Sequence, residues 1–420
     1  MAKSRLISAI DIGSSKIAAL IAQFREEESQ KLHIVGAASV PSRGVRKGQI
    51  VNIDEAVGAI SEAVEASERM AGYNISTAWV SVGGSHINSQ NSHGVVAVAQ
   101  PQNEIVAEDV RRVLEAARAI TLPSSSEIIH VIPRQYTVDS QEGVKDPVGM
   151  TGIRLEVDTH IITGSSPVIR NLSKCVTEVG CDIAGLAFTG LASSEAVLSD
   201  TEKELGVVLV DIGGGTMSMA IYAEGALSYS SVLQVGAINV TKDLAAGLRV
   251  SLESAEKIKL YLGSLKTKED DIDISSLNLP EEMKTVSTKT LVEGIIRPRL
   301  NEMFQITAGE IKKSNLGGLT PSGIVLTGGG ALTVGIVDSA KRMLGMPVRV
   351  GIPTHISGLI DDIENPAFAS TIGLLRLAQS DLESGNVGRG LSVPSFPSLN
   401  KIPVKGLLGK ATQWAKSLLP

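Results

Sequence analysis

The sequence predicts an α/β protein built from two related halves, because two buried strands about 200 residues apart each end in Asp-Ile-Gly. The first strand runs into DIGSSK (11–16) and the second into DIGGGT (211–216), and further strands are predicted after both turns. Repetition at this spacing indicates paired domains, since solenoid repeats recur every roughly 20 to 50 residues. The composition agrees, with 43% hydrophobic and 20% charged residues, because strands buried on both faces are largely apolar.

The first half is expected to contain an inserted subdomain. Four strands are predicted before it, at 5–10, 17–24, 32–40 and 77–82. A helix lies between the last two, with Asp54 as its N-cap and its end before Gly72. Prolines and short predicted strands then surround one helix at 108–120, which is typical of a small α+β unit. The first domain is therefore assigned to 1–84 and 159–192, and the insert to 85–158.

The second half is assigned to residues 193–381. Strands at 217–222 and 226–233 repeat the order of the first half. A mostly helical insert follows at about 234–302, with an acidic, looped centre. The strand GIVLTGGG and two helices close this half. A linker rich in Gly, Ser and Pro (382–403) then leads to a terminal helix at 404–420.

The two Asp-Ile-Gly turns carry residue types that bind phosphate. Glycines let backbone N–H groups approach phosphate oxygens, hydroxyl groups add donors, and a lysine offsets negative charge. An Asp at each strand end can hold Mg²⁺ through water, because this ion dehydrates reluctantly. One such turn alone is more often structural, but two that open matching halves predict a shared site for ATP and Mg²⁺. Its candidate residues are Asp11, Gly13, Ser14, Ser15, Lys16, Asp211, Gly213, Gly214, Gly215 and Thr216, with Asp11 and Asp211 as the metal candidates.

A third glycine turn, LTGGGALT, again follows a strand and precedes a helix. Alone it could be a tight turn that needs positive φ. The order DIGSSK, linking helix, DIGGGT and GGGA, however, resembles the superfamily of actin, sugar kinases and heat-shock chaperones. The resemblance implies an actin-like two-domain ATPase fold with duplicated ribonuclease-H-like halves. In that fold the first two turns bind the phosphates, and the third glycine turn lies beside the adenosine. Its candidate residues there are Gly328, Gly329 and Gly330, together with Glu256 and Lys259 of SAEKIK, a pair that alone reads as an ordinary i,i+3 contact on a solvated helix.

Within that superfamily the chain resembles the FtsA family of bacterial cell-division proteins. The matching stretches are GLASSEAVL, ELGVVLVDIGGGTMSMAIY, the subdomain inserted after GGSHI, and the tail. The resemblance implies an ATP-binding protein that polymerises into actin-like filaments and anchors filaments of the tubulin-like protein FtsZ to the cytoplasmic face of the membrane at the division septum. A pilus-assembly ATPase or a small-molecule kinase of the same fold is the alternative.

No catalytic residue is predicted. Related ATPases place a Glu or Gln at the start of the linking helix to orient the attacking water. Here that region reads AFTGLASSEA, so Thr189 or Gly190 occupies the place and Glu195 comes a turn or more later. Because Thr cannot act as a carboxylate base, we expect at most weak ATPase activity, with the nucleotide acting as an assembly ligand.

The terminal segment VKGLLGKATQWAKSLLP has the pattern of an amphipathic helix that lies in a lipid headgroup layer. Apolar residues recur at helical spacing, lysines lie on the other faces, and no acidic residue interrupts them. A terminal helix docked on the protein body is the alternative, which the long linker disfavours. The candidate membrane residues are Leu407, Leu408, Lys410, Trp414, Lys416, Leu418 and Leu419, and anionic lipid is the expected partner.

The FtsA resemblance also implies that the C-terminal peptide of FtsZ docks on the second domain. The run GIIRPRLNE offers Arg297, Arg299 and Glu302 for this peptide, since arginines can clamp carboxylates, although an ordinary charged helix flank would look the same. Other division proteins are further candidates as partners.

A net charge of −6 and 3% aromatic residues argue against nucleic-acid binding. Cys175 and Cys181 lack the spacing of a metal clip and are expected to be reduced.

Overall fold

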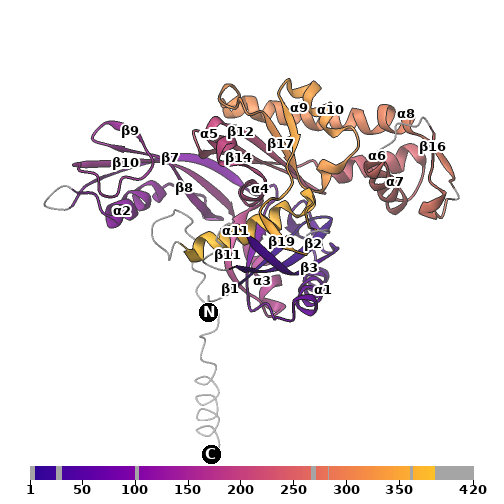
Figure 1. Cartoon of the computed structure of the whole chain (residues 1–420), viewed down its shortest axis with the longest axis horizontal. Helices are drawn as coiled ribbons and strands as arrows, with labels where there is room; N and C mark the ends of the chain where they lie inside the picture. The colour runs from indigo at the N-terminus through magenta and orange to yellow at the C-terminus, as the bar shows by residue number, and fades with distance from the viewer. Residues whose placement is uncertain are drawn as a thin grey trace, which may run out of the picture.

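The computed structural model describes residues 5–24, 31–99, 104–265, 271–281, 283–359 and 363–383. Three sheets of four or more strands organise these residues (Figure 1). One sheet belongs to each half, and the third belongs to the insert, which projects on one side of the molecule, opposite the region around α6 and α7. Within the described ranges, no helix is both long and apolar enough to cross a membrane.

The sheet of the first half has the order β11-β6-β1-β2-β3-β19. Its strands are β1 (Arg5–Ile12), β2 (Lys16–Phe24), β3 (Leu32–Pro41), β6 (Thr77–Val82), β11 (Asp182–Phe188) and β19 (Ile356–Gly358). Helices α1 (Ile53–Ala71) and α3 (Ser166–Glu178) pack together on one face, while α11 (Ala369–Glu383) covers the other (Figure 1). Strands β2 and β6 are buried almost continuously, which explains why they read as apolar runs without alternation.

Helix α1 begins two residues earlier than the sequence predicts. Its N-cap is Asn52, whose side chain accepts the N–H of Glu55 at 3.3 Å, and Asp54 lies inside the first turn. Asn serves as well as Asp at an N-cap, and an Asp in the first turn is favourable for its charge. The predicted end before Gly72 is confirmed, since this glycine has φ 72° and its N–H donates to the carbonyl of Glu68.

The sheet of the insert has the order β7-β10-β8-β9. Its elements are β7 (Asn88–Ala97), α2 (Ala107–Arg118), β8 (Ser126–Val138), β9 (Gln141–Val144) and β10 (Arg154–Ser165). The expectation of short strands was wrong for the two longest strands, because β8 has 13 residues and β10 has 12. Pro133 lies within β8 opposite Thr159, at a shift of register, and this irregularity lets the ladder continue past a residue without an N–H. Strand β10 also runs past the predicted boundary at residue 158.

The second half repeats the plan with the order β14-β13-β12-β17-β18. Its strands are β12 (Val207–Ile212), β13 (Met217–Ala223), β14 (Ala226–Leu233), β17 (Ile324–Thr327) and β18 (Val348–Val350). The main helices are α6 (Ala237–Leu248), α7 (Leu252–Ser264), α9 (Arg297–Ser314) and α10 (Ile336–Leu344). In place of the predicted acidic loop, β15 (Asp271–Asp273) pairs with β16 (Thr285–Ser287).

The chain returns to the first half near its end, in contrast to the assignment of all of 193–381 to one domain. Strand β19 pairs in parallel with β3, and α11 packs against β1, β2, β6 and α4 (Thr189–Val197). Because α11 is enclosed on several sides, its buried residues lie around most of its circumference. Its sequence therefore has no single apolar face that would show which half it packs against. This return brings the segment before α11 to the region between the halves.

Candidate functional site

The two Asp-Ile-Gly segments form turns of the same geometry. Each joins two antiparallel strands, β1 to β2 and β12 to β13. In the first turn the N–H of Gly13 donates to the carbonyl of Lys16 at 3.0 Å, and in the second the N–H of Gly213 donates to that of Thr216 at 2.9 Å. The internal repeat predicted from the sequence is therefore present in the backbone.

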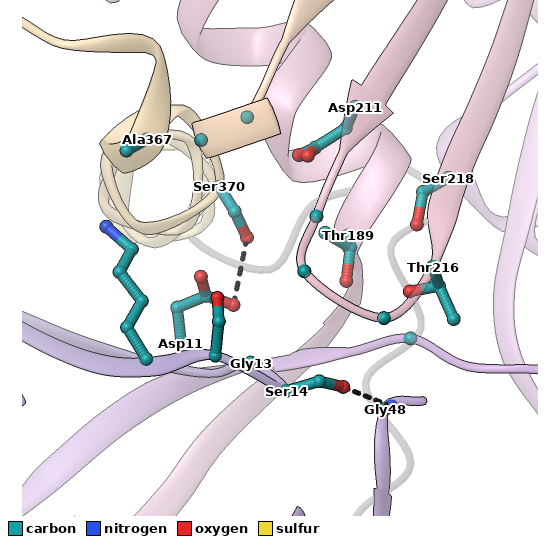
Figure 2. A pocket seen from close by; sticks show the side chains of 18 of the residues that line it. Asp11, Gly13, Ser14, Gly48, Thr189, Asp211, Thr216, Ser218, Ala367 and Ser370 are labelled. Carbon is teal, nitrogen blue, oxygen red and sulfur yellow. Dashed lines mark hydrogen bonds between the residues drawn. The ribbon is translucent and has the colours of Figure 1, made fainter. Parts of the chain in front are cut away.

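These turns face each other across a small cavity between the halves (Figure 2). A Cβ atom at Gly214 would lie 2.7 Å from the Cβ of Ser15, so only glycine fits at this distance without displacing its neighbour. The cavity between the turns holds about 90 Å³. Its lining includes Asp11, Gly13, Ser14, Ser15, Lys16, Gly48, Gly83, Thr189, Asp211, Gly213, Gly214, Gly215, Thr216, Ser218, Gly328, Gly329, Pro366, Ala367 and Ser370.

Both predicted aspartates point into this region, and serines hold them in place (Figure 2). The carboxylate of Asp11 accepts hydrogen bonds from Ser81 Oγ at 2.5 Å and Ser370 Oγ at 3.3 Å. That of Asp211 accepts one from Ser193 Oγ. Burial raises the pKa of Asp211 to about 7, with a smaller contribution from the charge of Asp11, while the bond from Ser193 opposes the shift. A cation between the two carboxylates would relieve this electrostatic cost.

The two carboxylates fit a Mg²⁺ ion that keeps most of its water. Mg²⁺ is usually held by one or two carboxylates together with waters and phosphate oxygens, and a set of protein ligands alone is not required. Within the described residues there is no group of three or more acidic, His or Cys side chains placed to hold a metal. Asp11 and Asp211 are therefore the residues that would hold Mg²⁺ here, and such an ion would neutralise phosphate charge.

Lys16 follows the first turn, and its ammonium group lies in a poorly solvated place. Burial lowers its pKa, and the charges of Asp11 and Asp211 oppose this shift. Its Nζ atom lies 3.7 Å from the centroid of the Phe368 ring. The position agrees with the predicted role of Lys16 beside phosphate, although its contact with an aromatic ring was not foreseen.

The third glycine turn contributes two of its three residues to the lining. Gly328 has φ 79°, and a Cβ there would lie 2.3 Å from Asp211 Oδ1. Gly329 also lines the cavity, whereas Gly330 packs against Ile212. Glycine is required at 328 by both its conformation and its distance to the carboxylate.

The predicted nucleoside residues Glu256 and Lys259 lie on α7, outside the lining of the cavity among the described residues. Lys259 Nζ donates to Glu256 Oε2 at 2.7 Å and to Thr241 Oγ1 of α6 at 3.0 Å. The lysine side chain is buried and that of Glu256 is 41% exposed, so this i,i+3 pair of α7 is partly buried and is joined to α6 through Thr241. Their placement at a nucleoside stays a prediction.

Sequence reasoning missed several functional positions. Ser81 and Ser193, which orient the aspartates, lie in apolar segments and carry no motif of their own. The segment Pro366–Ser370, which also lines the cavity, follows an Asn-Pro dipeptide, and such a dipeptide indicates a turn in the sequence. In the structure Asn365 is an N-cap, and its side chain accepts the N–H of Ala367 at 2.9 Å. The signal for Gly48 is a second glycine four residues earlier in GVRKGQ, and its N–H donates to Ser14 Oγ at 2.9 Å.

The linking helix α4 begins at Thr189, which lines the cavity, and its Oγ1 donates to the carbonyl of Val82 at 3.2 Å. Glu195 lies further along the helix and pairs with Lys203 Nζ at 2.8 Å. Among the described residues, the carboxylates that line the cavity are those of Asp11 and Asp211. The geometry therefore favours holding phosphate over activating a water molecule.

The residues predicted for peptide binding already have partners. Arg299 donates to Asp243 of α6 through Nε, at 2.5 Å from Oδ2, and through Nη2, at 2.9 Å from Oδ1. Glu302 also contacts Arg299, and Arg297 pairs with Glu293. The hydrogen bonds to Asp243 raise the pKa of Arg299.

All seven predicted membrane residues (407–419) lie outside the described residues.

Comparison with known proteins identifies the family. A family profile described as "Cell division protein FtsA" matches residues 208–373, and one described as "SHS2 domain inserted in FTSA" matches residues 84–163. The cell division protein FtsA of Pseudomonas aeruginosa is 36% identical over 416 residues, covering 98% of each chain. The chain belongs to the FtsA family of cell-division proteins. FtsA of Neisseria meningitidis is 39% identical, with 90% of this chain and 91% of the relative covered, and FtsA of Bacillus subtilis is 38% identical, with 90% and 84% covered.

Solved structures agree with an actin-like fold for this FtsA-family chain. The protein in the PilM–PilN type IV pilus biogenesis complex superposes with a TM-score of 0.63 at 16% identity, covering 89% of this chain and 98% of that one. MreB5 of Spiroplasma citri bound to AMPPNP gives 0.53 at 14% identity, covering 91% and 99%. The predicted actin-like fold with a small α+β insert is thereby confirmed, as is the FtsA resemblance.

Proposed function

We propose that this chain binds ATP and Mg²⁺ between its two halves and links FtsZ filaments to the cytoplasmic face of the membrane at the division septum. The observation that carries the ATP part is the pair of equivalent glycine turns, which face each other across the cavity. Backbone N–H groups and the hydroxyls of Ser14, Ser15 and Thr216 would contact the phosphates from both sides. An ATP molecule bound in this way contacts both halves at once, so it favours an arrangement in which the two turns face each other.

Slow turnover is part of this proposal. The cavity presents Thr189 where related ATPases place a residue that orients water, and Glu195 is engaged by Lys203. ATP would then set the assembly state of actin-like filaments, and hydrolysis would be a minor reaction. Single-turnover measurements should give at most weak release of phosphate.

The alternatives of the same fold receive less support. A pilus-assembly ATPase is compatible with the superposition on the PilM complex, but this likeness at 16% identity concerns the fold alone. A small-molecule kinase needs a catalytic carboxylate near its substrate, whereas the described carboxylates of the lining are the two at the strand ends. The FtsA relatives cover nearly the whole chain and therefore favour division.

Membrane attachment is assigned to the amphipathic segment 404–420, and FtsZ binding to the second half near α9. The lysines of the segment would contribute roughly 1 kcal/mol each near anionic lipid, which gives reversible attachment. The acidic and apolar C-terminal peptide of FtsZ suits the flank with Arg297, Arg299 and Glu302. Other division proteins remain candidates for the insert.

Co-sedimentation with liposomes of anionic lipid, in the presence of ATP, tests the attachment. The full chain is compared with a chain ending at Glu383, and Trp414→Glu is compared with Gln413→Ala as a matched change on the polar face. We expect the truncated chain and Trp414→Glu to stay in the supernatant, while Gln413→Ala sediments. Binding of fluorescent ATP by each protein reports whether it is folded. Unchanged sedimentation of the truncated chain would remove the anchor from the proposal.

A further inference from the structure

The ammonium group of Lys16 has an unusual environment for a charged side chain. Lys16 opens β2 beside the cavity, where burial lowers its pKa. Across the described part of the chain, its Nζ atom forms no hydrogen bond or ion pair with another residue. Its close partner is instead the face of the Phe368 ring, whose centroid is 3.7 Å away. The three N–H donors are thus uncommitted while the charge is stabilised.

The ring of Phe368 is held in a fixed place by its backbone. It ends the short helix η6 (Pro366–Phe368), and its N–H donates to the carbonyl of Asn365 at 2.9 Å. The carbonyl of Pro366 accepts the N–H of Gly328 at 3.1 Å. Two residues after the ring, Ser370 donates to Asp11 at 3.3 Å. The segment is therefore attached to the glycine turn of one half and to the aspartate of the other (Figure 2).

We propose that Phe368 is a positioning residue that holds the Lys16 ammonium group over the cavity and keeps its N–H donors free for the oxygens of a nucleoside polyphosphate. An aromatic face attracts a cation through its quadrupole, most strongly where water is excluded, but it has no lone pair that competes for the donors. A carboxylate in the same place would form a salt bridge that phosphate must displace. This inference rests on the proposed function, since it assumes that phosphate enters the cavity.

The ring also helps the lysine to stay charged at this position. Burial favours the neutral amine, and the charges of Asp11 and Asp211 oppose this effect. The ring face adds to that opposition, because it attracts the cation and not the neutral amine. Replacing the ring by an aliphatic side chain should therefore weaken phosphate binding in two ways. The ammonium group loses its fixed place, and its protonated form becomes less favoured at high pH.

A double-mutant cycle between Phe368 and Lys16 tests the proposal. Affinity for fluorescent ATP and ADP is measured for the wild-type chain, Phe368→Leu, Lys16→Met and the double variant, with Phe368→Tyr and Phe368→Trp as conservative replacements. We expect Phe368→Leu to weaken ATP binding several-fold, the two aromatic replacements to retain it, and Phe368→Leu to have no further effect when it is added to Lys16→Met. The loss in Phe368→Leu should grow as the pH is raised from 7 to 9.

Each outcome has a distinct meaning. If the wild-type chain does not bind ATP, the proposed function fails. If the wild-type chain binds ATP and Phe368→Leu binds it equally well, the positioning role is overturned while the proposed function stands. If Phe368→Leu causes the same loss in the wild-type chain and in the Lys16→Met variant, Phe368 acts only through packing, and this too overturns the inference. Thermal unfolding without nucleotide identifies a replacement that fails to fold, in which case the aromatic replacements and the pH dependence decide.

Discussion

The imidazole of His160 joins the insert to the second half of the molecule, because its Nε2 atom lies 3.0 Å from Ser230 Oγ of β14. Its Nδ1 atom lies 2.7 Å from Asn91 Oδ1 of the neighbouring strand β7. Burial lowers the pKa of His160 to about 3, so the ring is neutral and can donate through one nitrogen and accept through the other. Close by, Ser89 Oγ donates to the carbonyl of Ser230 at 2.7 Å. The insert thus belongs to the first half by chain connection and contacts the second by hydrogen bonds.

Replacing His160 by Ala should destabilise this junction. The change leaves Asn91 and Ser230 without their buried partner, which costs roughly 1–3 kcal/mol in the free energy of unfolding. Chemical denaturation measures this loss, and hydrogen exchange of β14 should rise with it. His93→Ala on the same sheet is the matched control, since its ring is half-exposed and its pairs with Asp158 and Glu156 are surface contacts worth at most about 1 kcal/mol. Equal effects of the two changes would contradict a special role of His160.

Asp211 should give the stability of the nucleotide-free chain a characteristic pH dependence. Burial raises its folded-state pKa to about 7 from an ordinary 3.8, so the native chain keeps a proton that the unfolded chain releases. This stabilising contribution is complete below pH 4 and is lost as the pH rises through 7, by about 1.4 kcal/mol per pH unit. Asp211→Asn does not lose stability in this way, because its side chain does not titrate. The melting temperature of Asp211→Asn minus that of the wild-type chain should therefore be larger at pH 7.5 than at pH 5.

Thermal unfolding between pH 4 and 8 measures the difference. Asp182→Asn, at the exposed start of β11, controls for the removal of one carboxylate of the same type. A gap between Asp211→Asn and the wild-type chain that stays constant over this range would argue against the protonated, buried carboxyl group.

The contact between the two glycine turns predicts the effect of one added methyl group. In Gly214→Ala the new Cβ would lie 2.7 Å from the Cβ of Ser15, so the turns must move apart. Overpacking of this kind costs about 1–3 kcal/mol, and we expect a roughly tenfold to hundredfold loss of ATP affinity. Gly58→Ala in α1 is the control, since nothing lies within 4 Å of its Cβ position. That change should raise stability by about 1 kcal/mol and leave ATP binding unchanged. Retained affinity in Gly214→Ala would mean that phosphate does not bind between the turns.

The sequence predicts the local parts of this structure well. Strands Thr77–Val82 and Ala226–Leu233 begin and end where the apolar pattern places them, and the two phosphate turns follow from the Asp-Ile-Gly motif. These features depend on neighbours in the chain, so a local pattern is sufficient to predict them. The same is true of the glycine at the end of α1.

The features that were missed depend on contacts between distant segments. The return of β19 to the edge of the first sheet pairs Ile356 with Leu32, and a three-residue strand gives no periodicity. Ser81 and Ser193 orient aspartates that lie 70 and 18 residues away in sequence. Phe368 reads as an ordinary apolar residue before a helix, because the charge that it contacts comes from the other end of the chain.

The pairing of Arg299 with Asp243 decides how the proposed FtsZ site must be tested. The single change Arg299→Glu removes a candidate contact for the peptide, but it also places two carboxylates against each other between α9 and α6. With side chains 24% and 31% exposed, this pair lies between surface and buried cases, and its loss should cost roughly 1–3 kcal/mol of stability. Weaker peptide binding by that variant alone would therefore have two explanations.

A charge reversal distinguishes loss of a peptide contact from loss of stability. The double variant Arg299→Glu with Asp243→Arg restores an ion pair between the same helices and should regain most of the lost stability. We expect it to bind the FtsZ C-terminal peptide as weakly as Arg299→Glu does, because the cation is no longer at position 299. Lys313→Glu, an exposed change of the same charge on α9, controls for net charge and should bind normally. Recovery of peptide binding in the double variant would assign Arg299 a structural role and exclude it from the contact surface.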